Sequence, residues 1–151
     1  MIARRTTRAA VAAHASSLVA VIAVTAAAGR PVIWAGMLAF AGPLVVGLAL
    51  RPGEPFIRAH LRAALAFNVS IALYLAAIVA TVRLTAGSPY TVQLVPFLLF
   101  VNMLLAFNWL VFTLIAMHRA ATSQLFTYPL TLPRLSRARA VPSSPTLGSP
   151  L

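Results

Sequence analysis

Long apolar stretches without charged residues dominate the chain and alternate with short polar breaks. Four stretches lack Arg, Lys, Asp and Glu, and they cover residues 9–29, 32–50, 63–82 and 84–118. A helix needs about 20 apolar residues to cross a hydrocarbon core about 30 Å thick, and the first three stretches have about that length. The fourth is longer and begins irregularly at residues 86–89. We therefore expect its helix to begin near Val92 or Pro96, since proline suits a first helical turn.

The breaks between these stretches are typical of turns at a membrane surface. Gly29-Arg30-Pro31 and the segment 51–55 are rich in Gly, Pro and charge, and backbone groups inside lipid must be hydrogen-bonded internally. The pattern predicts an all-α, polytopic membrane helical bundle of about four transmembrane helices. The predicted membrane domain covers residues 1–132, and its spans lie at about 10–28, 32–50, 63–83 and 94–117. Residues 133–151 are basic and rich in Pro and Ser, which predicts a disordered tail.

The amino-acid composition also indicates a chain that folds in a lipid bilayer. Hydrophobic residues make up 61% of the 151 residues and charged residues only 9%, whereas a soluble domain carries roughly 25% charged residues. So few charges could not cover the surface of a water-soluble globule. The sequence contains no Cys, which excludes disulfides, thiolate nucleophiles and Cys-ligated metals.

The first stretch has an alternative interpretation. Arg4, Arg5 and Arg8, an apolar core and Ala26-Ala27-Ala28 are also typical of a cleaved secretory signal. We favour a retained helix, because the apolar core is longer than the 7–15 residues usual for a signal.

The arginines predict an orientation. In a four-span chain, ten of the twelve cations fall on the side that holds both termini, and Arg30 and Arg83 fall on the other. The ten are Arg4, Arg5, Arg8, Arg51, Arg58, Arg62, Arg119, Arg134, Arg137 and Arg139. Because cytoplasmic loops retain Lys and Arg, both termini are predicted to be cytoplasmic, in the cell (cytoplasmic) membrane. This placement explains the pI near 12 without nucleic acid, which we do not expect as a partner, and it favours contact with anionic headgroups.

The loop that leads into the third span carries candidate interface residues. Arg58 and Arg62 are four residues apart and would share one helix face beside His60. We interpret such a helix as a membrane anchor. The alternative is a docking face for a partner or a lipid. His60 is either a pH-sensitive group or, as is more common for an interfacial His, a solvated one.

Three amides lie at membrane depth, at Asn68, Asn102 and Asn108. Interhelical hydrogen bonds are the usual partners of such groups, at about 0.6–2 kcal/mol each. We expect the three amides to pack between helices, and lining an aqueous path is the alternative. His60 and Asn68 are eight residues apart and are therefore expected to share a helix face.

Small residues and prolines predict close packing and a kink. Gly42-Pro43 inside the second span is expected to bend it, which is either structural or opens a polar cavity. Small residues at helical spacing in the first two spans favour packing within the chain, and homo-oligomer contacts are also possible. Tyr128 near a helix end is typical of an aromatic belt, and the deeper Trp109 is expected to pack.

Candidate catalytic groups are scarce. The chain has one carboxylate, Glu54, with no Lys and no Cys, and general acid–base chemistry usually uses such groups. His14, His60 and His118 lie toward one end of the predicted bundle and could converge, but no acid would orient them. We therefore expect no enzyme activity, no cofactor and no metal.

Several short motifs together resemble a known family. They are His14-Ala15-Ser16-Ser17-Leu18, Gly42-Pro43-Leu44-Val45, Pro55-Phe56-Ile57-Arg58-Ala59-His60, Ala64-Leu65-Ala66-Phe67-Asn68, and Arg119-Ala120 with Tyr128-Pro129-Leu130. In the order and spacing of these motifs, the chain resembles small bacterial membrane proteins of unassigned function. These proteins are related to the Tic-twenty-like component of chloroplast protein import. The resemblance implies a helical bundle in a membrane and no known cofactor. This chain departs from that pattern at Ala59, Ala66 and 121–123, where the family favours polar residues.

The sequence favours a structural, assembly or partner-binding membrane protein without catalytic chemistry. The alternative is a channel or transporter component. The candidate interface and packing residues are Gly42, Pro43, Arg58, His60, Arg62, Asn68, Asn102, Asn108, Tyr128 and Pro129.

Overall fold

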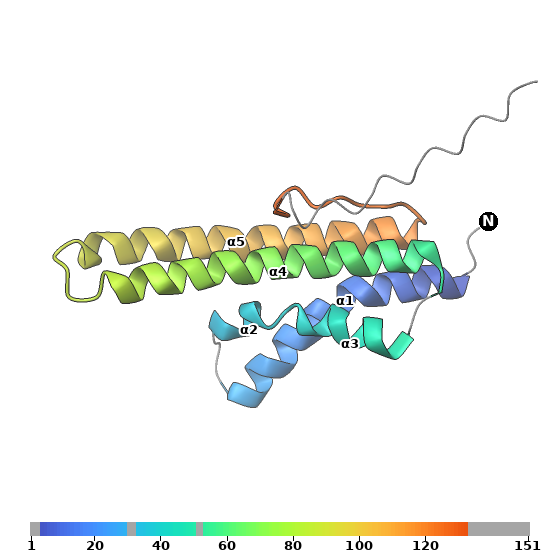
Figure 1. Cartoon of the computed structure of the whole chain (residues 1–151), viewed down its shortest axis with the longest axis horizontal. Helices are drawn as coiled ribbons and strands as arrows, with labels where there is room; N and C mark the ends of the chain where they lie inside the picture. Colours follow the sequence, from blue (N-terminus) through green and yellow to red (C-terminus); the bar gives the residue numbers. More distant parts are fainter. Residues whose placement is uncertain (1–3, 30–32, 51–52, 133–151) are drawn as a thin grey trace, which may run out of the picture.

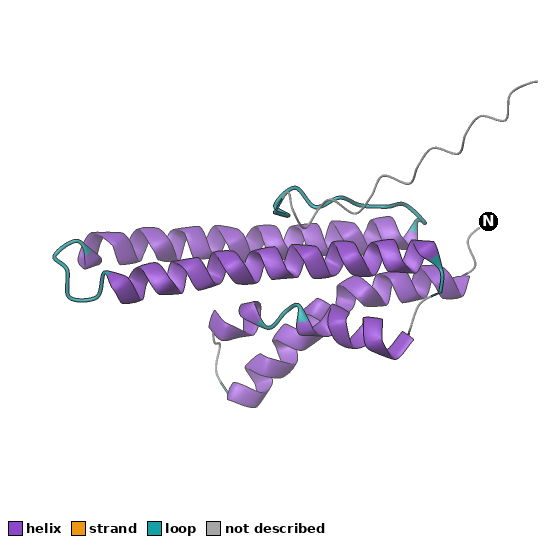
Figure 2. Ribbon diagram, viewed as in Figure 1, coloured by secondary structure: helices purple, strands orange, loops and turns teal. Residues whose placement is uncertain are grey.

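A computed structural model of the chain describes residues 4–29, 33–50 and 53–132. These residues form helices joined by turns and loops, and none of them lies in a strand (Figure 2). The helices are α1 (Arg4–Ala28), α2 (Ile33–Met37), α3 (Ala41–Leu50), α4 (Pro55–Leu84) and α5 (Thr91–Ala121). The predicted tail at 133–151 lies outside the described residues.

Two long helices form the frame of the molecule. α4 and α5 lie side by side and run in opposite directions (Figure 1). The first half of α1 packs against this pair, and its second half diverges from it (Figure 1). α2 and α3 lie on α1 and α4, which leaves most of α5 without a neighbour other than α4 and the start of α1.

Three of the helices have the length and hydropathy of membrane spans. These are α1, α4 and α5, with 25, 30 and 31 residues. Lengths of this kind cover an apolar layer about 30 Å thick at 1.5 Å per residue. The predicted fold class, an all-helical membrane bundle, is confirmed.

The second apolar stretch is not one continuous helix. α2 ends at Met37, a turn covers residues 38–40, and α3 has only 10 residues. The expected interruption of the second span at Gly42-Pro43 is found in the turn before these residues. A proline disturbs the residue four positions earlier, here Ala39, because it lacks an N–H and its ring clashes with that carbonyl. Pro43 lies in the first turn of α3, where its missing N–H removes no helical hydrogen bond. α3 alone rises only about 15 Å, which is half of a hydrocarbon core.

The start of α5 agrees within one residue with the first of the two expected positions, Val92. α5 begins at Thr91, so Pro96 lies in its second turn rather than its first. A proline at this position leaves the Val92 carbonyl without its helical donor. The turn before the helix, at Ser88 and Tyr90, supplies the backbone hydrogen bonds that begin it.

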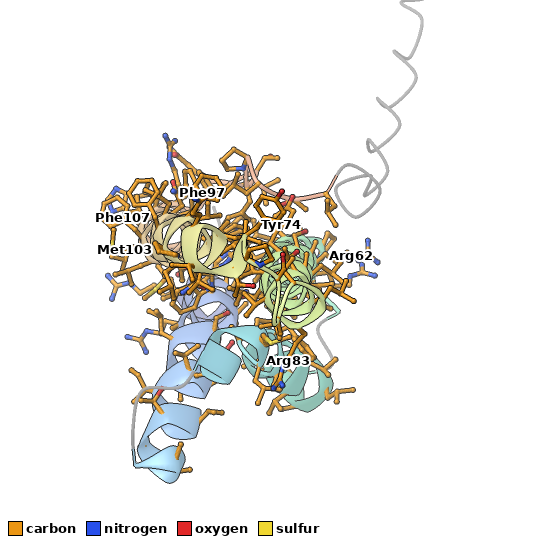
Figure 3. All side chains as sticks on the ribbon, turned by 90° about the vertical axis from the view of Figure 1, so that its left-hand side faces the viewer. Arg62, Tyr74, Arg83, Phe97, Met103 and Phe107 are labelled. Carbon is orange, nitrogen blue, oxygen red and sulfur yellow. The ribbon has the colours of Figure 1, made fainter. Side chains whose placement is uncertain are left out.

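The hydrophobic core is small and lies between α4, α5 and the segment that follows α5. Its buried members are Phe67, Ile71, Leu75, Ala116 and Tyr128. Most other large apolar side chains point outward. Figure 3 shows Phe97, Met103 and Phe107 projecting from α5, and these three residues are 60–65% exposed. Large exposed apolar surface of this extent fits a chain whose outer faces contact lipid.

The arginines gather at the two ends of the bundle. α1 and α4 begin, and α5 ends, at the same end of the molecule (Figure 1). The exposed arginines at that end are Arg4, Arg5, Arg8, Arg58, Arg62 and Arg119. Arg62 and Arg83 on α4 are separated by about 30 Å along the helix axis, which matches the thickness of a hydrocarbon core.

Candidate functional site

Buried polar side chains gather where α1, α4, α5 and the segment after α5 meet. Less than 5% of the surface of each of these residues is exposed. The cluster comprises His14 and Ser17 of α1, His60, Asn68 and Ser70 of α4, Thr113 of α5, and Tyr128. Polar groups inside a membrane bundle are costly unless they find partners, so their hydrogen bonds define what the site can do.

Two imidazoles and a phenol form a hydrogen-bonded chain. The Tyr128 hydroxyl lies 2.8 Å from Nδ1 of His14. Nε2 of His14 lies 2.8 Å from Nδ1 of His60. The two rings meet edge to face with centroids 5.1 Å apart. Residues that are 46 and 114 positions apart in the sequence are thereby joined.

The Tyr128 hydroxyl determines which ring nitrogens of His14 and His60 carry protons. Burial raises the pKa of Tyr128 above its ordinary value near 10, so the hydroxyl keeps its proton. Among the described residues the hydroxyl has no acceptor other than His14, so it donates to Nδ1 of His14. His14 then carries its proton on Nε2 and donates to His60. His60 in turn carries its proton on Nε2.

One end of this chain is unsatisfied. Nε2 of His60 is buried and makes no hydrogen bond within the described part of the chain. The backbone of Gln124 lies near this ring, but it does not reach hydrogen-bond geometry with Nε2. An unpaired buried donor costs about 1–3 kcal/mol. Since His60 is 1% exposed, the expectation that it is a solvated interfacial residue is wrong.

Asn68 is a second centre of hydrogen bonding and joins three helices. Its side-chain nitrogen donates to the Ser17 hydroxyl of α1 at 2.9 Å and to the Ala64 carbonyl of its own helix at 2.7 Å. Its side-chain oxygen accepts from the indole nitrogen of Trp109 on α5 at 2.8 Å. Two of its three hydrogen bonds therefore run between helices, which is the packing role expected for it.

The segment after α5 turns back alongside the α4–α5 pair (Figure 1) and contributes Tyr128 to the cluster. Tyr128 stacks on Phe67 with centroids 4.0 Å apart. The backbone N–H of Leu132 donates to the Ser70 hydroxyl at 3.1 Å, and the Tyr74 hydroxyl donates to the Leu130 carbonyl at 3.3 Å. Tyr128 is thus a buried anchor for this segment, and its assignment to an aromatic belt is wrong.

Gly42 lets α3 cross α1 at close range. A Cβ at this position would lie 2.1 Å from the carbonyl oxygen of Ser16 and 2.8 Å from the amide nitrogen of Ser17. Only glycine fits against backbone at such distances. The contact holds α3 next to the turn of α1 that supplies Ser17 to the polar cluster, and the adjacent Pro43 is also buried.

The remaining predicted site residues lie outside this cluster. Arg58, Arg62 and Pro129 are exposed. The Asn108 amide donates to the Leu104 carbonyl of its own helix at 2.8 Å, so it joins no second helix. Asn102 lines a separate pocket, described below.

The sequence allowed His14 and His60 to converge, and they do, but it did not indicate Ser17 and Trp109 as partners in the cluster. His60 and Asn68 were expected to share a face, and both are buried in the same cluster. His118 is exposed and does not join the other two histidines. The one usable signal was that His14 and Ser17 lie in the same short motif, three residues apart. That spacing places them on one helix face.

The cluster is organised for hydrogen bonding rather than for holding a metal ion. Both nitrogens of His14 already have partners. Within the described residues, no group of three or more His, Asp or Glu side chains comes together. What the geometry does provide is a set of internal bonds that fix α1, α4, α5 and the following segment relative to one another.

Comparison with known proteins identifies a family. The model of the magnetosome magnetite crystal formation protein family, MamF/MmsF, matches residues 5–135. No curated protein and no solved structure matches the chain. The expected kinship with the Tic-twenty-like family is wrong, because the matching family is a different one. The match covers α1 to α5 and the segment that carries Tyr128, so this chain belongs to the MamF/MmsF magnetosome magnetite crystal formation protein family.

Proposed function

We propose that the chain is a structural or assembly protein of the magnetosome membrane that acts in magnetite crystal formation without catalysing a reaction. The proposed process, magnetite crystal formation, is taken from the family to which the chain belongs. The observation that carries the structural role is the hydrogen bonding of Asn68, which connects Ser17 of α1 to Trp109 of α5. Polar groups used in this way hold helices in register.

The end of the bundle that carries the exposed arginines is suited to contact a membrane surface. Six exposed arginines from α1, α4 and α5 share one end of the bundle, and the structure describes one acid, Glu54, in the loop at that end. Each cation near an anionic surface contributes about 1 kcal/mol of attraction. We propose that this end faces the cytoplasm and contacts anionic headgroups, which would place both termini in the cytoplasm. Headgroup contact leaves the apolar outer face of the bundle available to lipid or to a membrane-protein partner.

Complementation tests this proposal. The full-length chain is expressed in a magnetite-forming bacterium that lacks its own member of the family, and crystals are measured by electron microscopy. We expect restored crystals from the wild-type chain and from Asn108→Leu, whose amide bonds only within α5. We expect weaker restoration from Asn68→Leu at equal membrane abundance. A chain that reaches the magnetosome membrane and leaves crystals unchanged would overturn the proposed process.

A flux measurement tests the non-transport part of the proposal separately. The alternative role as a channel or transporter component requires polar groups that line a path, whereas Asn68 is used between helices. Purified chain in phosphatidylcholine vesicles should leave ion and solute permeability at the level of empty vesicles. Flux that depends on the chain, and that is lost in Asn68→Leu while the fold persists, would replace the structural role by transport.

A further inference from the structure

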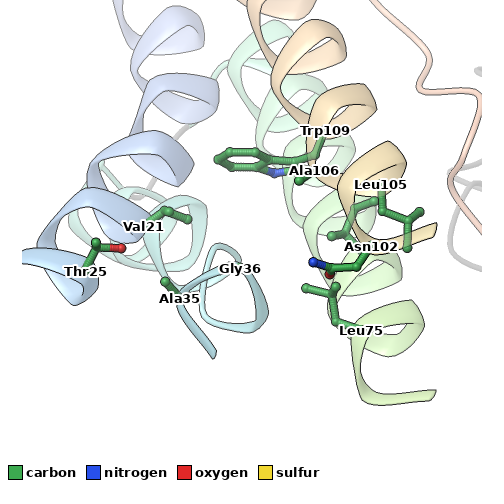
Figure 4. A pocket seen from close by; sticks show the side chains of 10 residues that line it. Val21, Thr25, Ala35, Gly36, Leu75, Asn102, Leu105, Ala106 and Trp109 are labelled. Carbon is green, nitrogen blue, oxygen red and sulfur yellow. The ribbon is translucent and has the colours of Figure 1, made fainter. Parts of the chain in front are cut away.

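A pocket opens where the second half of α1 diverges from the α4–α5 pair (Figure 4). It measures about 320 Å³. Most of its wall is apolar, and α1, α2, α4 and α5 all contribute to it. The residues that matter to its chemistry are Val21, Thr25, Ile71, Leu75, Asn102 and Trp109.

Two polar groups face this apolar space from opposite sides. Figure 4 shows the Asn102 amide directed into the pocket from α5, and the Thr25 hydroxyl directed toward it from α1. Neither group hydrogen-bonds to any residue that the structure describes. The other two membrane-depth amides differ in this respect, since Asn68 and Asn108 are both bonded within the protein.

The wall behind Asn102 is held in place. The indole of Trp109 is fixed by its hydrogen bond to Asn68 at 2.8 Å. On the opposite side, Gly36 lies so close to α4 that a Cβ there would be 3.0 Å from the Leu75 side chain. The pocket is therefore bounded by side chains and backbone with fixed partners, rather than by freely rotating ones.

Depth and size restrict what can enter. Leu75 lies beside Asn102 in the wall, about 12 Å along α4 from Arg83, so the pocket opens within the hydrocarbon layer. A water molecule needs two to four polar partners, and this wall offers only Asn102 and Thr25 within an otherwise apolar lining. A cavity of about 320 Å³ with this lining suits an apolar chain that carries one polar end.

We propose that this pocket binds one single-chain membrane lipid with a neutral hydroxyl or carbonyl group, which pairs with the Asn102 amide. The apolar chain lies against Val21, Ile71 and Leu75, and Trp109 closes one end. Thr25 supplies a second hydrogen-bonding group for the same head. The inference rests on the chain spanning a membrane and stands independently of the proposed role in crystal formation.

Photo-cross-linking tests the site directly. The full-length chain in phosphatidylcholine vesicles is irradiated with a diazirine-bearing hexadecanol, and labelled residues are mapped by mass spectrometry. We expect labelling at pocket residues. Loss of one neutral hydrogen bond in Asn102→Leu should weaken labelling about fivefold, and the matched control Asn108→Leu should label as the wild type does.

A filled pocket gives a second variant that does not depend on Asn102. Ala106 lines the pocket and is exposed, so Ala106→Phe adds bulk there without entering the core. We expect Ala106→Phe to abolish pocket labelling while Phe97 and Phe107 on the outer face label as before. Labelling spread evenly over α5 and unchanged by either variant would overturn the proposal. So would an Ala106→Cys chain that forms disulfide-linked dimers in the membrane, because a second copy would then occupy the site.

Discussion

The indole nitrogen of Trp109 donates a hydrogen bond to the side-chain oxygen of Asn68 at 2.8 Å. This bond joins the two longest helices at the level where Asn68 also donates to Ser17 of α1. One amide thereby fixes the relative positions of three helices. A bond of this kind in a membrane protein is worth about 0.6–2 kcal/mol.

Replacing Asn68 should cost more than replacing Asn108. Asn68→Leu removes two interhelical bonds and leaves the part-buried indole N–H of Trp109 unpaired, so we expect a loss of about 1–3 kcal/mol in the free energy of unfolding. Asn108→Leu removes only a bond to its own helix, and its loss should stay below about 0.5 kcal/mol. Denaturation in mixed micelles, followed by circular dichroism, measures both. Equal losses would show that Asn68 has no special role.

The contact between α1 and α3 should be sensitive to a single methyl group. In Gly42→Ala the new Cβ would meet the Ser16 carbonyl oxygen at 2.1 Å, so the two helices must separate. We expect a loss of about 1–3 kcal/mol. Gly47→Ala in the same helix is the matched control, because its Cβ would lie 3.9 Å from the nearest side chain. If Gly42→Ala unfolds at the same denaturant concentration as Gly47→Ala, the close crossing of these helices is contradicted.

Tyr128 should control the order of the segment after α5. Tyr128→Phe keeps the stack on Phe67 but removes the bond to His14. We expect about 1–3 kcal/mol of destabilisation, because Nδ1 of His14 loses its donor. Tyr128→Ala removes both contacts and should increase hydrogen exchange throughout residues 122–132.

The exposed Tyr90 provides the control for that experiment. It is 72% exposed, so Tyr90→Ala should leave exchange in residues 122–132 unchanged. Protection in this segment that survives Tyr128→Ala would show that the hydrogen bonds at Ser70 and Tyr74 hold it without the phenol.

Local pattern predicted the helices but not the polar cluster. Uninterrupted apolar stretches are sufficient to indicate α1, α4 and α5, since the length of a membrane span follows from the thickness of the bilayer. The break at residues 38–40 lies one turn before the expected bend at Gly42-Pro43, since a proline disturbs the turn that precedes it. The close crossing of α3 and α1 at Gly42 is a tertiary contact that hydropathy does not contain.

The cluster itself depends on distances in space that spacing along the chain does not contain. His14 and His60 are 46 residues apart, and each taken alone is typical of an interfacial histidine. Asn68, Asn102 and Asn108 are equivalent in the sequence, yet the structure gives them three different environments. What separates them is which neighbouring helix lies opposite, and that depends on the packing of the whole bundle.

Topology can be tested with single cysteines, because the natural chain has none. Ala86 lies exposed between α4 and α5, and Thr127 lies exposed after α5. If both termini face the cytoplasm, a membrane-impermeant maleimide should label Thr127→Cys in isolated, sealed magnetosomes and Ala86→Cys only after detergent is added. The reverse pattern would invert the proposed orientation while leaving the fold intact.

A double-mutant cycle on Asn68 and Trp109 tests most directly that internal hydrogen bonds hold this bundle together. Unfolding free energies are measured in micelles for the wild type, Asn68→Leu, Trp109→Phe and the double variant, which isolates the coupling between the two side chains. The structure predicts a favourable coupling of about 0.6–2 kcal/mol. Additive losses, with a coupling indistinguishable from zero, would contradict a bond between α4 and α5 at this position.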